Sequence, residues 1–281
     1  MITDRKDEMT APARTWAVFS KPWAELAAEP LAELVRRLGF TAIELPVRDG
    51  AFVTPERAPA ELPGFVETLH SLGIDVVSVA SEPTPSVLSA CAAAGVPMIR
   101  IMAPIQSDGY RASVRRLRQD LERLAPECER TGVRIGIQPH HGAFVSTVLG
   151  VYELIRGLPT EFCLVWDAGH DALAGEDPAY TLEQCGDRLG LVNLKNAVYR
   201  RVDDGTPARF RTWFGAGDQG LADWPKIINR LQLIDYDGPI CLTAQYSDTT
   251  AGEVADLVAA DLNWARFLDS SADVGRPASA S

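Results

Sequence analysis

Short apolar runs alternate with longer amphipathic stretches along most of the chain. Eight runs have the length and composition of buried β-strands: Thr15–Ser20, Ala42–Pro46, Asp75–Ala80, Pro97–Met102, Val133–Pro139, Phe162–Asp167, Gly190–Lys195 and Pro239–Gln245. Eight helical patterns lie between and after them: Leu31–Leu38, Leu62–Leu72, Val87–Ala94, Val114–Arg130, Leu149–Arg156, Thr181–Arg188, Trp224–Leu231 and Glu253–Leu268. This strict alternation predicts a parallel sheet with helical crossovers.

Eight strand–helix units predict closure into an α/β fold of one domain, a (β/α)8 TIM barrel. A doubly wound open sheet is the alternative, but no glycine-rich nucleotide-binding turn follows the first predicted strand. Glycines such as Gly39 and Gly132 separate a helical pattern from the next strand, as helix C-terminal caps do. We expect the barrel to span residues 14–269, with a flexible segment at 1–13 and a disordered tail at 270–281.

Polar side chains fall on one of the two alternating faces of the predicted strands. Ile43 and Leu45 flank Glu44, and Ile99 and Ile101 flank Arg100. Because alternate side chains of a strand face opposite ways, we expect the polar set to line the barrel interior. That set consists of Glu44, Arg100, Gln138, His140, Asp167, Asn193, Lys195, Thr243 and Gln245. Barrel enzymes place their chemistry at the C-terminal strand ends, where most of these residues lie. Glu44 and Arg100 lie deeper in the barrel. For these two residues a buried ion pair that only fixes packing is as good an interpretation as a role in function.

The composition narrows the class of protein. The chain has 281 residues, 46% of them hydrophobic, and a net charge of −11. No apolar run approaches the roughly 20 residues of a membrane-spanning helix, and residues 1–13 lack the apolar core of a secretory signal, so we expect a cytoplasmic protein. Because such an acidic chain repels phosphate backbones, we expect a small-molecule substrate and neither nucleic acid nor membrane as partner. A homodimer stays open. The five scattered cysteines are expected to be buried, reduced thiols.

Five segments in chain order resemble motifs of inosose-dehydratase-like proteins, which belong to the xylose isomerase-like barrel superfamily. They are Gln138–Thr147 (QPHHGAFVST), Trp166–Pro178 (WDAGHDALAGEDP), Leu191–Asn196 (LVNLKN), Phe214–Asp218 (FGAGD) and Tyr236–Pro239 (YDGP). Ala42–Leu45 is a weaker match. The resemblance covers roughly Thr15 to Leu268. It is specific for the superfamily and much less so for one activity, because barrels support many chemistries.

The resemblance implies a divalent metal held by Glu, Asp, His and Glu at the ends of strands five to eight. This chain has Gln138, Asp167, Asn193 and Thr243 (or Gln245) at those positions. Only Asp167 is a usual ligand of such a metal, so we predict no tightly bound metal of the family type and no cofactor. Mn, Mg, Co or Zn would enter only through a rebuilt site that joins Asp167 to His140, His141 or His170.

The resemblance also implies a type of reaction. In it a proton moves next to a carbonyl group, which leads to isomerisation, epimerisation or loss of water. Without the metal, Lys195 is the expected stabiliser of the developing enolate. His140 or His170 is the expected general base or acid, and Asp167 either orients His170 or serves as the base. Substrate contacts are expected from Glu44, Arg100, Gln138, Asn193, Thr243, Gln245 and Trp213, the last in the loop after strand seven.

Three functions therefore compete. The first is a metal-independent isomerase, epimerase or dehydratase-type lyase acting on a sugar, a cyclitol or a related polar carbonyl compound. The second is a tailoring lyase or cyclase of secondary metabolism, with a more apolar substrate. The third is a barrel that binds a sugar without turnover. The DNA-repair endonuclease branch needs a multi-zinc cluster and a basic groove, and four histidines with a net charge of −11 argue against it.

Overall fold

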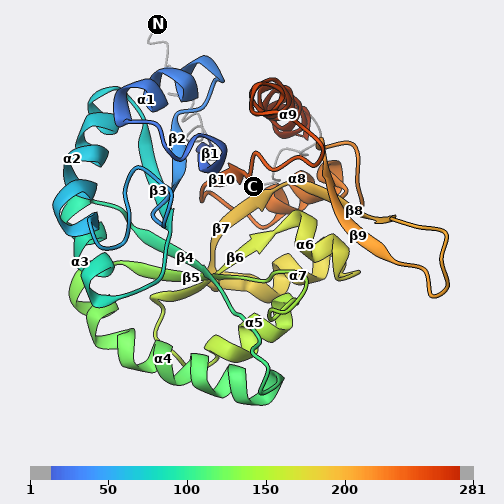
Figure 1. The fold of residues 1–281 in the computed structure, drawn as a ribbon, viewed down its shortest axis with the longest axis horizontal. Coiled ribbons are helices and arrows are strands. Elements are labelled where there is room, and N and C mark those ends of the chain that lie inside the picture. Colours follow the sequence, from blue (N-terminus) through green and yellow to red (C-terminus); the bar gives the residue numbers. More distant parts are fainter. Residues whose placement is uncertain (1–13, 273–281) are drawn as a thin grey trace, which may run out of the picture.

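Eight parallel strands close into a barrel in the computed structural model, which describes residues 14–272 (Figure 1). The strands follow one another around the barrel in the order β1-β10-β7-β6-β5-β4-β3-β2. Their bounds are β1 Trp16–Phe19, β2 Ala42–Pro46, β3 Asp75–Ala80, β4 Met98–Met102, β5 Arg134–Gln138, β6 Phe162–Asp167, β7 Leu189–Leu194 and β10 Ile240–Leu242. The predicted single-domain (β/α)8 barrel is confirmed.

Helices cover the outside of the barrel (Figure 1). They are α1 Ala28–Arg37, α2 Ala58–Ser71, α3 Pro85–Ala94, α4 Tyr110–Thr131, α5 Val148–Ile155, α7 Pro178–Cys185, α8 Trp224–Leu233 and α9 Ala251–Ala272. Local sequence sets their ends. Helix α3, for example, begins where the side chain of Thr84 accepts a hydrogen bond from the Val87 amide, and it ends at Gly95 with φ of +70°. Outward-facing strand residues and the inner helix faces form the main core.

The barrel interior has an apolar part, which reaches the carboxyl ends of β1 and β3 at Phe19 and Ala80, and a polar part centred on the carboxyl ends of its strands. The apolar part consists of Ala17, Phe19, Ala42, Ala80, Met98, Cys163, Val165, Leu191 and Cys241. Two glycines leave room for these side chains. A Cβ on Gly136 would lie 2.6 Å from Val165, and one on Gly190 would lie 2.6 Å from the sulfur of Cys163. The polar part therefore lies against closely packed apolar side chains. The five cysteines are buried and unpaired, as expected.

Two elements differ from the sequence-based prediction. The segment expected as a loop after strand seven is an antiparallel hairpin, β8 Asn196–Arg201 and β9 Phe210–Gly215, which projects from the barrel (Figure 1). A short helix, α6 Ala168–Leu173, directly follows β6. The hairpin has no burial pattern of a core strand, because its two strands pair with each other and most of its residues are at least partly exposed. Hydrophobic periodicity therefore does not mark it.

The chain ends also require corrections. The predicted tail begins at residue 270, but α9 continues through Ala272. Residues 1–13 and 273–281 lie outside the described residues, so the predictions for them are not tested. The predicted eighth strand extends to Gln245, but β10 ends at Leu242, because Ala244 adopts a left-handed conformation with φ of +47°. Within residues 14–272, no helix is long and apolar enough to cross a membrane.

Candidate active site at the carboxyl end of the barrel

A buried ion pair begins the polar network inside the barrel. Arg100 on β4 donates from Nε to Oε1 of Glu44 on β2 at 2.6 Å, and from Nη2 to Oε2 at 2.9 Å. The hydroxyl of Ser78 on β3 donates to the same Oε1 at 2.9 Å. All three residues are buried. The two-point geometry satisfies both charges inside the barrel, so the ion pair that the sequence left as one of two alternatives is present.

An amide bridge carries the network from this ion pair to Asp167. Gln138, the last residue of β5, accepts from Nη1 of Arg100 through Oε1 at 2.6 Å and donates from Nε2 to Oδ2 of Asp167 at 2.5 Å. A guanidinium only donates and a carboxylate only accepts, so the amide has one orientation that satisfies both neighbours. A glutamate here would place two carboxylates in contact.

Asp167 ends β6 and caps the next helix. Its Oδ1 accepts from the backbone N–H of His170, which makes it the N-cap of α6. Its Oδ2 lies 3.2 Å from Nζ of Lys195, the residue that follows β7. One carboxylate therefore fixes both the helix that carries His170 and the only lysine among the inward-facing residues predicted from the sequence.

Lys195 lies buried at the centre of the site. Its stem passes over Gly169, where a Cβ would lie 2.8 Å from the lysine Cγ. Its Nζ lies 2.8 Å from Nε2 of His170 and 3.5 Å from Oε1 of Gln245. Burial lowers the pKa of Lys195, an effect that the carboxylate of Asp167 opposes.

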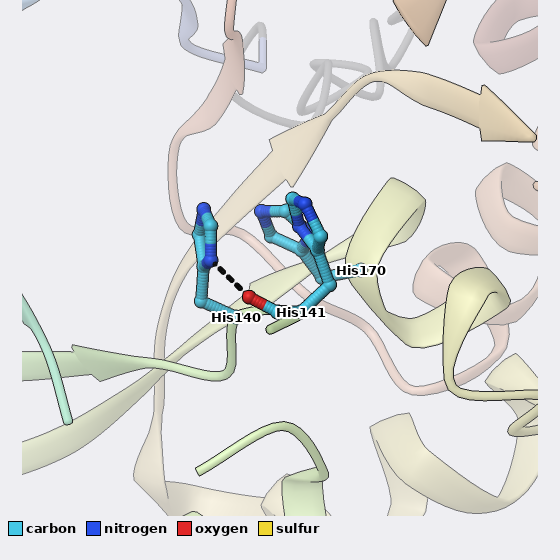
Figure 2. A group of neighbouring side chains, drawn as sticks. All are labelled: His140, His141 and His170. Atoms are coloured by element: carbon cyan, nitrogen blue, oxygen red, sulfur yellow. Dashed lines mark hydrogen bonds between the residues drawn. The ribbon is translucent and has the colours of Figure 1, made fainter. Parts of the chain in front are cut away.

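Three histidine rings lie close together (Figure 2), and one of them, His170, contacts this lysine. Nδ1 of His170 lies 3.1 Å from Nδ1 of His141, and the ring centroids of His140 and His170 are 4.0 Å apart. Burial is the largest cause that lowers the pKa of each ring, and the Lys195 charge also lowers all three. The pKa of His140 falls to about 4 from these causes together. The three imidazoles are therefore neutral at pH 7.

The hydrogen-bond partners assign the protons of these rings. An ammonium donates to Nε2 of His170, so Nδ1 of His170 carries the proton and donates to Nδ1 of His141. His140 donates from Nδ1 to the carbonyl oxygen of His141 at 2.8 Å (Figure 2). Its Nε2 then holds a lone pair, and no other group within residues 14–272 is recorded as its partner. Of the three rings, His140 is the one that can accept a proton.

The residues at the family's metal positions do not fit a divalent cation. Asp167 is the only carboxylate among them, and its two oxygens already hold Gln138, Lys195 and the His170 amide. An ammonium 3.2 Å from the single acidic ligand repels a dication. The three histidines are a different set. One ligand atom from each lies within 4.8 Å of the others, and neutral imidazoles suit zinc, copper or nickel more than magnesium.

The structure brings most of the predicted site residues together. Glu44, Arg100, Gln138, Asp167, Lys195, His170 and Gln245 form one connected network, and His140 packs against His170. Asn193 on β7 and Thr243, which directly follows the neighbouring strand β10, are also buried. In the described part of the chain neither Asn193 Oδ1 nor Thr243 Oγ1 has a hydrogen-bond partner. A buried acceptor of this kind is available to a ligand or to an ordered water.

Trp213 is not part of this arrangement. It lies on β9 rather than in a loop, with its ring under the guanidinium of Arg200 and its Nε1 donating to Asp248 at 3.1 Å. The neighbouring Phe214 faces the site instead, with its ring centre 5.2 Å from Nζ of Lys195. Ser78 was not among the residues predicted from the sequence, although it is the one hydroxyl in an apolar strand.

A hollow of about 770 Å³ lies at the opposite end of the barrel, lined by residues such as Thr15, Asp75 and Gly190. None of the network residues lines it. Because barrel enzymes use the carboxyl ends of the strands, the network marks the functional end and the hollow does not.

A closed parallel barrel with a charged network at its carboxyl end defines a (β/α)8 protein with a candidate site at that end. The chain belongs to the xylose isomerase-like TIM barrel family, which matches residues 32–268. It is 28% identical over 145 residues to an inosose dehydratase of Lacticaseibacillus casei, covering 48% of each protein. It is 29% identical over 139 residues to one of Geobacillus kaustophilus, covering 47% of this chain and 45% of that protein. The match spans about half the length of these relatives.

Solved structures share the fold at low identity. A 3-keto-D-glucoside 4-epimerase from E. coli superposes with a TM-score of 0.71 at 12% identity, covering 91% of this chain and all of that one. An L-ribulose 3-epimerase gives 0.71 at 15% identity, with 96% and 100% coverage. A probable 3-DHS dehydratase from Bacillus anthracis gives 0.67 at 13%, with 89% and 97% coverage. Identities this low show the fold alone.

Proposed function

We propose that this protein is an isomerase, epimerase or dehydratase-type enzyme that moves a proton next to a carbonyl group. Its substrate is a sugar, a cyclitol or a related polar small molecule, and the reaction proceeds without the divalent metal usual in the family. The inosose dehydratases and sugar epimerases among the compared proteins support this reaction class.

The position of the Lys195 ammonium carries the proposal. It lies among a carboxylate oxygen of Asp167, a ring nitrogen of His170 and, more distantly, an amide oxygen of Gln245. Oxygen and nitrogen atoms that carry lone pairs surround the ammonium, as they would surround a bound metal cation, but here the cation is part of the chain. A fixed positive charge in a buried site stabilises a developing enolate without reorganisation of the site.

The remaining groups divide the work of proton transfer. Nε2 of His140 takes the proton from the carbon beside the carbonyl, and the charge that develops on the carbonyl oxygen is stabilised by Lys195. Delivery of a proton from water to the opposite face gives an epimer. Return of the abstracted proton to the former carbonyl carbon, with the neighbouring hydroxyl proton passing to the former carbonyl oxygen, gives an isomer. Departure of a neighbouring hydroxyl with a proton gives water and a dehydrated product. His170 positions Lys195 and takes no part in this transfer.

Substrate hydroxyls have acceptors available in the same region. Oδ1 of Asn193 and Oγ1 of Thr243 are buried without partners among the described residues, and a hydroxyl donating to them would satisfy both. These polar groups favour a polyhydroxylated substrate over the apolar one that a tailoring lyase or cyclase would need.

Solvent exchange tests the proposal without knowledge of the physiological substrate. Chelator-treated protein is incubated with a panel of ketoses, inososes and their phosphorylated or carboxylated counterparts in D2O, and proton NMR follows the C–H signals beside the carbonyl. We expect the wild type to exchange or convert at least one compound. Lys195→Met and His140→Gln should reduce the rate by about 100-fold or more.

Matched controls lie outside the site. Lys226→Met on α8 and His70→Ala on α2 remove the same residue types from exposed positions, and both should keep the wild-type rate. Wild-type exchange that survives Lys195→Met would refute the role of the lysine. A sugar that binds without exchange or conversion would favour the non-catalytic barrel.

A further inference from the structure

Four cationic side chains lie at the carboxyl end of the barrel. Arg100 and Lys195 belong to the network already described. Lys21 lies in the short 3-10 turn Lys21–Trp23 after β1, and Arg48 follows β2. The four charges are close enough to act on one another. Arg48 and Arg100 lower the pKa of Lys21 after the larger effect of burial, and Lys21 and Arg100 contribute to the lowered pKa of Lys195.

Arg48 is placed against Arg100 by a shared aromatic ring. The guanidinium carbon of Arg48 lies 5.5 Å from the ring centre of Phe19, and that of Arg100 lies 4.9 Å from the same centre. Stacking on one ring holds two like charges in one region of the barrel interior. Their repulsion requires a negative charge nearby, and Glu44 meets Arg100 with both of its oxygens.

Arg48 has no such partner. Its Nε is buried and unpaired, and within residues 14–272 the side chains of Arg48 and of the exposed Lys21 form no ion pair or hydrogen bond. The two carboxylates of the region, Glu44 and Asp167, are paired with Arg100 and Lys195. Two positive charges are therefore left without an ion-pair partner in a protein whose net charge is −11. Burial and the charge of Arg100 lower the pKa of Arg48 by more than the charge of Glu44 raises it. Keeping a guanidinium half-buried and unpaired costs free energy.

We propose that Arg48, assisted by Lys21, binds an oxyanion carried by the substrate, a carboxylate or a phosphate, at the mouth of the barrel. This inference rests on the proposed function and narrows its substrate class to anionic carbonyl compounds. A guanidinium fork suits the planar or tetrahedral oxygens of such groups. The local positive charge also draws an anion toward a site that the acidic remainder of the protein would repel.

Inorganic phosphate and malonate serve as probes of the site. Binding to the full chain is measured by titration calorimetry at constant ionic strength, with chloride as the reference anion. We expect saturable binding of at least one probe. Arg48→Met should weaken it by about tenfold or more, and Arg48→Lys should restore part of the affinity because it restores the charge. The preferred probe identifies the group as phosphate or carboxylate.

Arg211→Met is the matched control, since it removes one guanidinium from an exposed ion pair with Asp248 on the projecting hairpin. It should bind the probes with wild-type affinity. The inference is overturned if neither probe binds saturably, if Arg48→Met retains wild-type affinity, or if Arg211→Met weakens binding as much as Arg48→Met. Failure of the proposed function is separate, because it shows as exchange that survives Lys195→Met.

Discussion

The ammonium of Lys195 lies 3.2 Å from Oδ2 of Asp167, and the two side chains are 6% and 0% exposed. The two residues follow or end neighbouring strands, with Asp167 on β6 paired in register with Asn193 on β7. Their contact places a fixed cation beside the one carboxylate that the chain keeps at the family's metal positions. The same contact makes the site dependent on both partners for stability.

Removal of the lysine charge alone should destabilise the fold. Lys195→Met leaves the Asp167 carboxylate buried without its cation, and we expect the free energy of unfolding to fall by about 3–5 kcal/mol. The double variant Lys195→Met/Asp167→Asn should recover a large part of that loss but none of the exchange activity. Urea denaturation measures the first effect and NMR exchange the second. Lys226→Met, which breaks an exposed pair with Asp177, should change stability by less than about 1 kcal/mol. An equal loss in the single and double variants would contradict the pairing.

Gly169 provides the space through which the lysine stem passes. A Cβ there would lie 2.8 Å from Cγ and 3.3 Å from Cε of Lys195, so Gly169→Ala should displace the ammonium. We expect a loss of stability of about 1–3 kcal/mol from overpacking and a lower exchange rate. Gly252→Ala in α9 is the control, because nothing lies within 4 Å of its added Cβ. It should be neutral or stabilising by up to about 1 kcal/mol. Wild-type stability and exchange in Gly169→Ala would show that the stem does not depend on this gap.

Asp171 on α6 should make stability depend on pH. Burial, followed by the charge of Glu176, raises its pKa from 3.8 to about 7. Between those two pH values the folded chain holds a proton that the unfolded chain has lost. The free energy of unfolding therefore falls as pH rises through this window. Asp171→Asn removes this contribution, so its stability relative to the wild type should improve by about 2–4 kcal/mol between pH 4 and pH 7.

Denaturant titrations at several pH values measure that difference, and the titrating histidines cancel because both proteins contain them. Glu129→Gln, at an exposed position on α4, is the control for the loss of one carboxylate. A constant difference between Asp171→Asn and the wild type across the window would contradict the raised pKa.

Metal content distinguishes a site in which Lys195 is the cation from a site in which the three histidines hold a metal ion. Protein purified without chelator is analysed by elemental mass spectrometry, and we expect far less than one equivalent of Mn, Mg, Co or Zn, because Lys195 already neutralises Asp167. Near-stoichiometric zinc that is lost in His141→Ala but kept in His70→Ala would instead assign a metal to the three histidines. Near-stoichiometric Mg or Mn would contradict the conclusion that the residues at the family's metal positions do not fit a divalent cation.

Much of the architecture was predictable from local pattern. Three strands, Ala42–Pro46, Asp75–Ala80 and Phe162–Asp167, have the predicted bounds, because a buried parallel strand between two helices is a continuous apolar run. The two-residue alternation around Glu44 and Arg100 also placed both side chains inside the barrel, where the structure pairs them. The number of strands and the direction of their side chains depend on residues that are close in sequence, so both can be predicted from the sequence.

The contacts that define the site depend on distances across the barrel and were decided only by the tertiary structure. No local pattern shows that Gly169 makes room for Lys195, that Phe214 rather than Trp213 faces the histidines, or that Arg48 shares Phe19 with Arg100. These relationships arise because barrel closure brings the carboxyl ends of distant strands within a few ångströms of one another. The sequence by itself determined which polar groups enter the barrel, and closure determined which charges are paired and which are left for a ligand.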